Sequence, residues 1–293
     1  MGKRSEGSAF GVILWSGRGE TVEVRATEQV DLGPALDRIE AAVDAAGSSG
    51  TADLKALGFW PLVSRVKLDR ALIVAHADQI GRIDTKAFRA AVKMRVPVWV
   101  GNALLTTGVV VGAVAVGAAF AWQTPLWKGL ALIAAGLIWT VGVHSPTHWL
   151  VGTMVGIRWT DYFLGGPPPP RPGLKSDYAT YLRADPDSRA WMHASGALAT
   201  KVAPFVALAF WPGSGAPWWA AAVLAGVGVL QIVTDLTLST KSSDWKKFNR
   251  EKAIARRRRA ALEPGAPEVE YEAVTGPPDV PPVFPRAPSP PVP

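Results

Sequence analysis

Three long stretches without a single charged residue constrain this chain more than any other feature. They cover residues 96–127, 129–157 and 202–234. A helix of about 20 apolar residues crosses the hydrocarbon layer of a bilayer. The stretches and their borders therefore predict an α-helical integral membrane protein with about four transmembrane helices, which we place at residues 98–121, 126–156, 194–211 and 217–237. A composition of 48% hydrophobic and only 19% charged residues agrees with this class.

The distribution of basic residues predicts the orientation of these helices. Lysines and arginines precede the first helix, fill the loop 158–192 and follow the fourth helix, whereas the two opposite loops carry only Lys128. Basic loops remain on the cytoplasmic side. We therefore expect a multi-pass protein of a prokaryotic cytoplasmic membrane, with both termini cytoplasmic. We attribute the net charge of +7 to contacts with membrane lipids, and we expect no nucleic acid as a partner.

Residues 1–95 are predicted to form a small soluble α+β domain in the cytoplasm. Val, Ile and Thr on both sides of Ser16–Gly19 indicate a β-hairpin. Apolar residues at helical spacing predict a helix over Leu32–Ala46. Further helices are expected over Val63–Ile80 and from Asp84, which is suited to cap a helix.

The rest of the chain divides into three parts. Residues 96–240 form the membrane domain, 241–262 a basic segment beside the membrane, and 263–293 a disordered Pro-rich tail. Four consecutive arginines in the basic segment predict contact with anionic lipid headgroups. Within the cytoplasmic loop we expect a strand over Trp159–Leu164, a polyproline spacer over Pro167–Pro170 and a helix over Asp177–Arg183.

Polar residues that can bind a metal lie near the predicted cytoplasmic ends of three helices. His144 and His148 are four residues apart, so both imidazoles point from one helix face. Asp235 lies at the same predicted depth at the end of the fourth helix, and His193 lies at the start of the third. Two histidines and one carboxylate leave a fourth position open, as in catalytic zinc sites. We therefore predict metal binding by His144, His148 and Asp235, with zinc as cofactor and His193 as an additional candidate.

Each of these residues also has a simpler interpretation. The histidines could meet lipid headgroups at a helix end, and Asp235 could pair with Lys241. The chain contains no cysteine, which excludes thiolate ligands and disulfides.

The segment 129–240 resembles the site-2 proteases, which are zinc-dependent intramembrane proteases. Their His-Glu-x-x-His motif is similar to His144–His148, which Gly156-Ile157 follows at the family's distance. Their Ala-Gly-Pro-x-x-Asn motif is similar to Ser195–Thr200, and their Leu-Asp-Gly-Gly motif matches here only at Asp235. The resemblance implies a site-2-protease-like core, the three metal ligands named above and a partner or substrate that offers a transmembrane segment.

Two departures from the family pattern predict weak or absent proteolysis. Ser145 occupies the position of the glutamate that acts as general base, and a hydroxyl is a poor base near neutral pH. Thr200 occupies the position of the asparagine that stabilises developing negative charge. The preferred hypothesis is a metal-binding pseudoenzyme that binds membrane segments of other proteins.

Other hypotheses remain open from the sequence. Asp161 or Asp177 could replace the missing base in an active protease, and His193 could bind haem together with His144 or His148. A transporter has only Asp235 and Lys201 as ionisable groups within its spans. A Gly108–Gly112 pair on the first helix permits close helix approach and leaves a homo-oligomer open.

Overall fold

The computed structural model describes residues 13–15, 21–23, 32–47, 52–165, 171–237 and 243–261. In chain order, these residues form the elements β1 (Ile13–Trp15), β2 (Thr21–Glu23), α1 (Leu32–Ala46), α2 (Phe59–Val66), α3 (Arg70–Ala91), β3 (Met94–Pro97), α4 (Val98–Ala121), α5 (Pro125–Met154), β4 (Trp159–Gly165), β5 (Arg171–Ser176), α6 (Tyr178–Arg183), α7 (Pro186–Ala209), α8 (Trp211–Ser214), α9 (Trp218–Thr237) and α10 (Asp244–Ala260).

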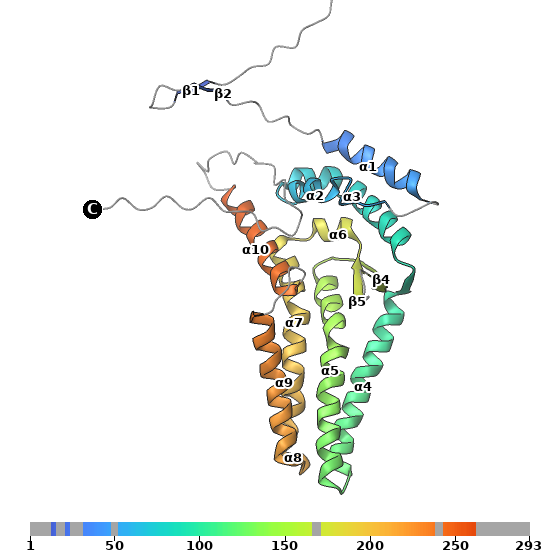
Figure 1. Cartoon of the computed structure of the whole chain (residues 1–293), viewed down its shortest axis with the longest axis vertical. Coiled ribbons are helices and arrows are strands. Elements are labelled where there is room, and N and C mark those ends of the chain that lie inside the picture. The colour runs from blue at the N-terminus through green and yellow to red at the C-terminus, as the bar shows by residue number, and fades with distance from the viewer. Residues whose placement is uncertain are drawn as a thin grey trace, which may run out of the picture.

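Among the described residues, four helical segments are long and apolar enough to cross a membrane, which confirms the predicted number. They are α4, α5, α7 together with α8, and α9, and they run side by side in Figure 1. Large apolar side chains such as Val141 and Trp218 point outward and are 70% and 75% exposed. Such a surface suits lipid rather than water.

The third of these segments begins at Pro186 rather than at residue 194. The carboxylate of Asp185 caps the helix by accepting a hydrogen bond from the amide of Asp187. Proline is favoured at the first helical position, because its missing N–H would have no partner there. The first turn of α7, which contains Asp187, Ser188 and Arg189, is polar and extends the helix toward the soluble part of the molecule.

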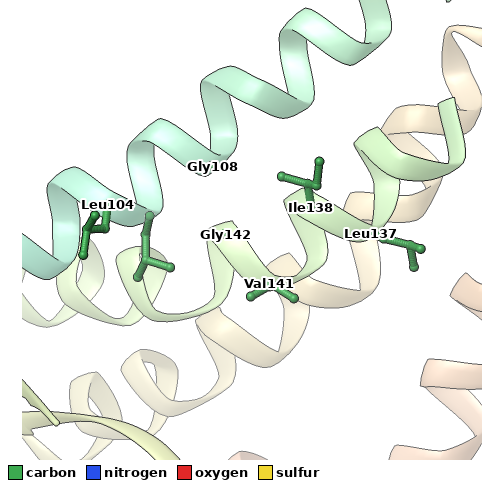
Figure 2. Close-up of a pocket in the computed structure, with 7 residues that line it drawn as sticks. Leu104, Gly108, Leu137, Ile138, Val141 and Gly142 are labelled. Atoms are coloured by element: carbon green, nitrogen blue, oxygen red, sulfur yellow. The ribbon is translucent and has the colours of Figure 1, made fainter. Parts of the chain in front are cut away.

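Glycines allow the long helices to pack closely. A Cβ at Gly112 would overlap the indole of Trp139 on α5, and that indole donates a hydrogen bond to the carbonyl of Val109 at 2.9 Å. One member of the predicted Gly108–Gly112 pair thus contacts α5 within the same chain. Gly108 and Gly142 face an apolar groove of about 360 Å³ between α4 and α5, which Figure 2 shows.

A three-stranded antiparallel sheet lies at one end of the long helices. Its order is β3–β4–β5, with Arg95 opposite Phe163 and Tyr162 opposite Leu174. The hydroxyl of Tyr162 donates to the side chain of Asn102 on α4 at 2.8 Å, which ties the sheet to the first long helix. The predicted strand in the loop is confirmed as β4.

The helix predicted after this sheet is also confirmed, and it is α6. Asp177 caps it by accepting from the amides of Ala179 and Thr180.

The N-terminal helices form a separate hydrophobic core at the same end. Side chains from α1, α2 and α3 meet in it, among them Leu36, Phe59 and Ile80, which are fully buried. The predicted helix over Leu32–Ala46 is confirmed as α1, and β1 pairs antiparallel with β2 as the hairpin predicted.

The prediction that Asp84 begins a helix is wrong. The helix α3 runs unbroken from Arg70 to Ala91, and Asp69 is its cap. Asp84 lies inside α3 because the buried face of that helix continues past Ile80 to Ile83. The Asp84 carboxylate is buried and forms an ion pair with Lys175 of β5. Asp84 therefore joins the N-terminal helices to the sheet.

The basic segment after α9 forms α10. Ser243 caps it by accepting from the amide of Lys246, and basic residues end it, where they interact favourably with the helix dipole. This helix packs against α7 and the N-terminal helices (Figure 1). Arg258 donates to the carbonyl of Lys67, and Arg259 pairs with Asp187, so part of the arginine run binds protein. The predicted Pro-rich spacer and tail lie outside the described residues.

Candidate metal centre

The two histidines of α5 lie against each other as their spacing predicted. The ring centroids of His144 and His148 are 4.8 Å apart, and the ring planes are nearly perpendicular. Pro146 lies between them without ending the helix. Both rings face α7 and the start of α10, because their hydrogen-bond partners come from those elements.

Hydrogen bonds to Nδ1 fix the orientation of both rings. Nδ1 of His148 lies 2.6 Å from the carbonyl oxygen of Met192, which can only accept, so Nδ1 carries the proton. Nδ1 of His144 lies 2.9 Å from Oγ1 of Thr200, whose own proton goes to the carbonyl of Gly196 at 2.8 Å. The hydroxyl therefore accepts from His144. Histidines that bind metal through Nε2 are oriented in this way, by donating the other N–H to a protein oxygen.

The nearest carboxylate to both Nε2 atoms is that of Asp244, at the start of α10. Its Oδ2 lies 3.3 Å from Nε2 of His148 and 3.5 Å from Nε2 of His144. Its Oδ1 accepts from Lys247 at 3.2 Å. Burial raises the pKa of the Asp244 carboxyl, but contact with His148 and the charge of Lys247 outweigh burial and hold the pKa below its usual range.

The two distances from Asp244 to the imidazoles fit a tetrahedral metal ion. Bonds of about 2.0–2.1 Å to nitrogen and oxygen place neighbouring ligand atoms of a tetrahedron about 3.4 Å apart. The three ligand atoms all lie within 4.8 Å of one another. Two imidazole lone pairs facing a carboxylate repel each other unless positive charge lies between them, and either a divalent cation or protons on the imidazoles can supply it. The donor set of two nitrogens and one oxygen suits zinc, with one coordination position left open.

Asp235, the carboxylate predicted from sequence, lies elsewhere in the described part of the chain. It forms an ion pair with Lys201 of α7, and the amine of Lys201 lies 5.9 Å from the ring centre of Trp245. The simpler prediction paired Asp235 with Lys241, which is outside the described residues. The group of possible ligand atoms contains Asp244 and not Asp235.

Sequence reasoning missed Asp244 because it follows the last apolar stretch, in a basic segment expected to lie beside the membrane. The Ser243-Asp244 pair is a recognisable helix start. No local pattern indicates that this helix packs onto α7.

His193 and the two helper positions have distinct roles in the structure. Nε2 of His193 lies 3.0 Å from the hydroxyl of Tyr181, which donates its own proton to Glu251. Nε2 of His193 therefore donates, and His193 is not part of the group of three ligands. Thr200, expected at the position of the family asparagine, instead holds the ring of His144. Ser145 lies between the two histidines on α5, and its side chain carries a hydroxyl instead of a carboxylate.

The alternative bases from the loop do not join the group either. Asp177 caps α6 and forms an ion pair with Arg158 at 3.1 Å. Asp161 lies on β4 opposite Lys175 and Pro97. Neither aspartate belongs to the group of possible ligand atoms around the histidines.

Fold and site together define a chain with four membrane-length helices and a candidate metal centre of two imidazoles and one carboxylate at one end of them. The chain matches no protein-family model, no curated protein and no solved structure.

Proposed function

We propose that this chain is a multi-pass membrane protein that holds a divalent metal ion, zinc in the first instance, with His144, His148 and Asp244. In this proposal it is a relative of the site-2 proteases that binds a membrane segment of a partner protein and cleaves it weakly or not at all. The end that carries the N-terminal helices and α10 faces the cytoplasm, in agreement with its basic residues.

The observation that carries the metal site is the orientation of both imidazoles. Each ring donates its Nδ1 proton to a protein oxygen and turns its Nε2 toward the same carboxylate oxygen, at 3.3 Å and 3.5 Å. A histidine that merely meets headgroups needs no such pair of fixed tautomers. A divalent cation held there would act as a Lewis acid at its open position.

In the described part of the chain, Asp244 is the one acidic residue in the group with the two histidines, and this supports weak proteolysis. A base must reach the reacting group within about 3 Å, directly or through one water. Ser145 occupies the position of the general base in the family, and its hydroxyl accepts a proton poorly near neutral pH. Two further carboxylates, those of Asp235 and Glu251, already pair with Lys201 and Arg189. The membrane segment as ligand rests on the resemblance alone.

A haem site is less well supported by the packing around His148. A Cβ at Gly196 would overlap Nε2 of this ring, so the backbone of α7 already fills that side. In a bis-histidine haem site, the flat porphyrin must fit directly beside the ligand nitrogen of each axial histidine. We therefore retain the simple metal ion.

The test is the metal content of the protein purified in detergent with zinc present. We expect about one zinc per chain in the wild type, and loss of that zinc in His144→Ala, His148→Ala and Asp244→Ala. His76→Ala is the matched control, because His76 lies on α3 and outside the group of ligands. Zinc retained by all three site variants, or absent from the wild type, would refute the metal site.

A further inference from the structure

The helix that supplies Asp244 is attached to the molecule by a buried charged side chain as well as by apolar ones. The buried residues of α10 are Glu251, Ile254 and Ala255. Of these, Glu251 makes the polar contacts and is 2% exposed. An attachment of this kind is sensitive to the loss of one partner, because a buried charge is then left without its counterion.

Glu251 connects three parts of the fold at once. Its Oε2 accepts from Nε of Arg189 on α7 at 2.7 Å. Its Oε1 accepts from the amine of Lys67, just after α2, and from the hydroxyl of Tyr181 on α6, both at 2.8 Å. Arg189 is itself fully buried and donates to three carbonyls at the end of α6. The cluster thus joins α10 to both the long helices and the N-terminal helices.

The same helix face carries Glu251 and the candidate metal ligand. Asp244 and Glu251 are seven residues apart, which is two turns of a helix and about 10 Å along its axis. A helix of this length is stiff over two turns. The position of Glu251 in its cluster therefore determines whether Asp244 lies within reach of His144 and His148.

We propose that α10 is a latch on the metal centre: Glu251, held by Arg189 and Lys67, seats this helix, and only the seated helix brings Asp244 to the histidines. Because Lys67 directly follows α2, the N-terminal helices take part in seating α10 and so contribute to metal affinity at the long helices. The inference deepens the proposed function and rests on the proposed metal site.

The first test compares zinc affinity among variants of the full-length protein. Glu251→Gln leaves Lys67 and Arg189 without their counterion, and we expect zinc to bind at least about 10-fold more weakly. Asp244→Asn should weaken zinc by more than about 100-fold, because a ligand contributes more than the outer-shell groups around it. The double variant should bind no more weakly than Asp244→Asn alone, since both changes remove the same ligand.

Two further variants separate the latch from general damage to the fold. Lys67→Met leaves Glu251 paired with Arg189 and Tyr181, so it should weaken zinc in the same direction but less. Lys252→Gln is the matched control on α10. It breaks a partly exposed ion pair with Asp187, and we expect less than about a fivefold effect.

The second test follows the seating of α10 directly. Ala255 on this helix is 5% exposed and the chain has no cysteine, so Ala255→Cys supplies a single buried thiol. Maleimide should label this thiol slowly in the otherwise wild-type protein and at least about 10-fold faster beside Glu251→Gln.

The outcomes distinguish the two proposals. If Glu251→Gln binds zinc like the wild type while Asp244→Asn does not, the metal site stands and the latch is refuted. An unchanged labelling rate of the introduced thiol beside Glu251→Gln also refutes the latch. A wild type that binds no zinc overturns both proposals.

Discussion

The Asp244 carboxylate lies 3.3 Å from Nε2 of His148, although the two residues are 96 positions apart in the chain. Asp244 reaches His148 because α10 packs along α7, whose Met192 carbonyl also orients the same imidazole. The contact therefore depends on three helices at once.

Replacing either candidate carboxylate by an amide should have opposite effects on zinc binding. Asp244→Asn should lose zinc and stay folded, because it keeps the size of the side chain. Asp235→Asn should keep zinc and lose on the order of 2 kcal/mol of stability, because Lys201 loses its partner. Zinc titration and thermal unfolding of both variants check this. Zinc lost in Asp235→Asn and kept in Asp244→Asn would restore Asp235 as the ligand.

Thr200 should act on the metal through His144. Thr200→Val removes the oxygen that accepts from Nδ1 of His144, so the ring loses its fixed orientation. We expect zinc affinity to fall by about 10–100-fold. Thr200→Ser keeps the hydroxyl and should bind nearly as the wild type does. Equal affinities for the Val and Ser variants would exclude this role.

Gly196 should be required for the space beside the ligand atom of His148. A Cβ there would overlap Nε2, so Gly196→Ala must displace the ring or α7 and should abolish stoichiometric zinc binding. Gly226→Ala on α9 is the control, because a Cβ at that position meets no atom within 4 Å. Metal analysis of the two purified variants decides the matter. A zinc-loaded Gly196→Ala protein would contradict the geometry.

A carboxylate at position 145 should restore hydrolysis if the base alone is missing. We expect zinc-loaded Ser145→Glu to cleave a reconstituted membrane peptide at least about 100-fold faster than the isosteric Ser145→Gln. Mass spectrometry of the peptide after incubation measures both rates. Equal rates in the two variants would show that more than the base is lacking.

The Glu251 cluster should make stability depend on acid pH. Burial raises the pKa of Glu251, but the charges of Lys67 and Arg189 prevail and lower it from 4.5 to about 2. A lowered pKa stabilises the fold fully above pH 4.5, and this stabilisation disappears as pH falls through about 2. It amounts to on the order of 3 kcal/mol.

The melting temperatures of wild type and Glu251→Gln test this pH dependence. They should differ most near pH 7 and converge toward about pH 2. Residues that titrate identically in both proteins cancel in this comparison. A difference that stays constant over this range would assign the stability of the cluster to packing rather than to charge.

The elements of this fold that depend on local pattern were predictable from sequence. The uncharged stretches predicted four membrane-length helices, and the helix over residues 98–121 matches α4 at both ends. Spacing placed His144 and His148 together. What failed depends on long-range contact: Asp84 has the properties of a cap, yet it pairs with Lys175 from β5. Asp235 has a matching predicted depth, yet it forms an ion pair with Lys201 on the neighbouring helix α7.

Asp244 shows the same limit of sequence-based prediction, because it joins the candidate site but was not predicted to do so. It lies in the basic segment 241–262, of which only the four consecutive arginines were expected to contact lipid, and no metal ligand was predicted there. Folding of this segment onto the protein depends on the negative groups that it meets, Asp187 among them, and on the carbonyl of Lys67. A pattern of charge along one segment does not reveal which distant groups will face it.

The position of Asp244 after α9 also fixes an order of events during biosynthesis. A ribosome delivers His144 and His148 in the second long helix, well before the residue that completes their donor set. Two imidazoles alone hold zinc weakly, so a partly synthesised chain has little capacity to capture the ion. In the proposed site, metal would then bind only after all four long helices and the start of α10 have been synthesised.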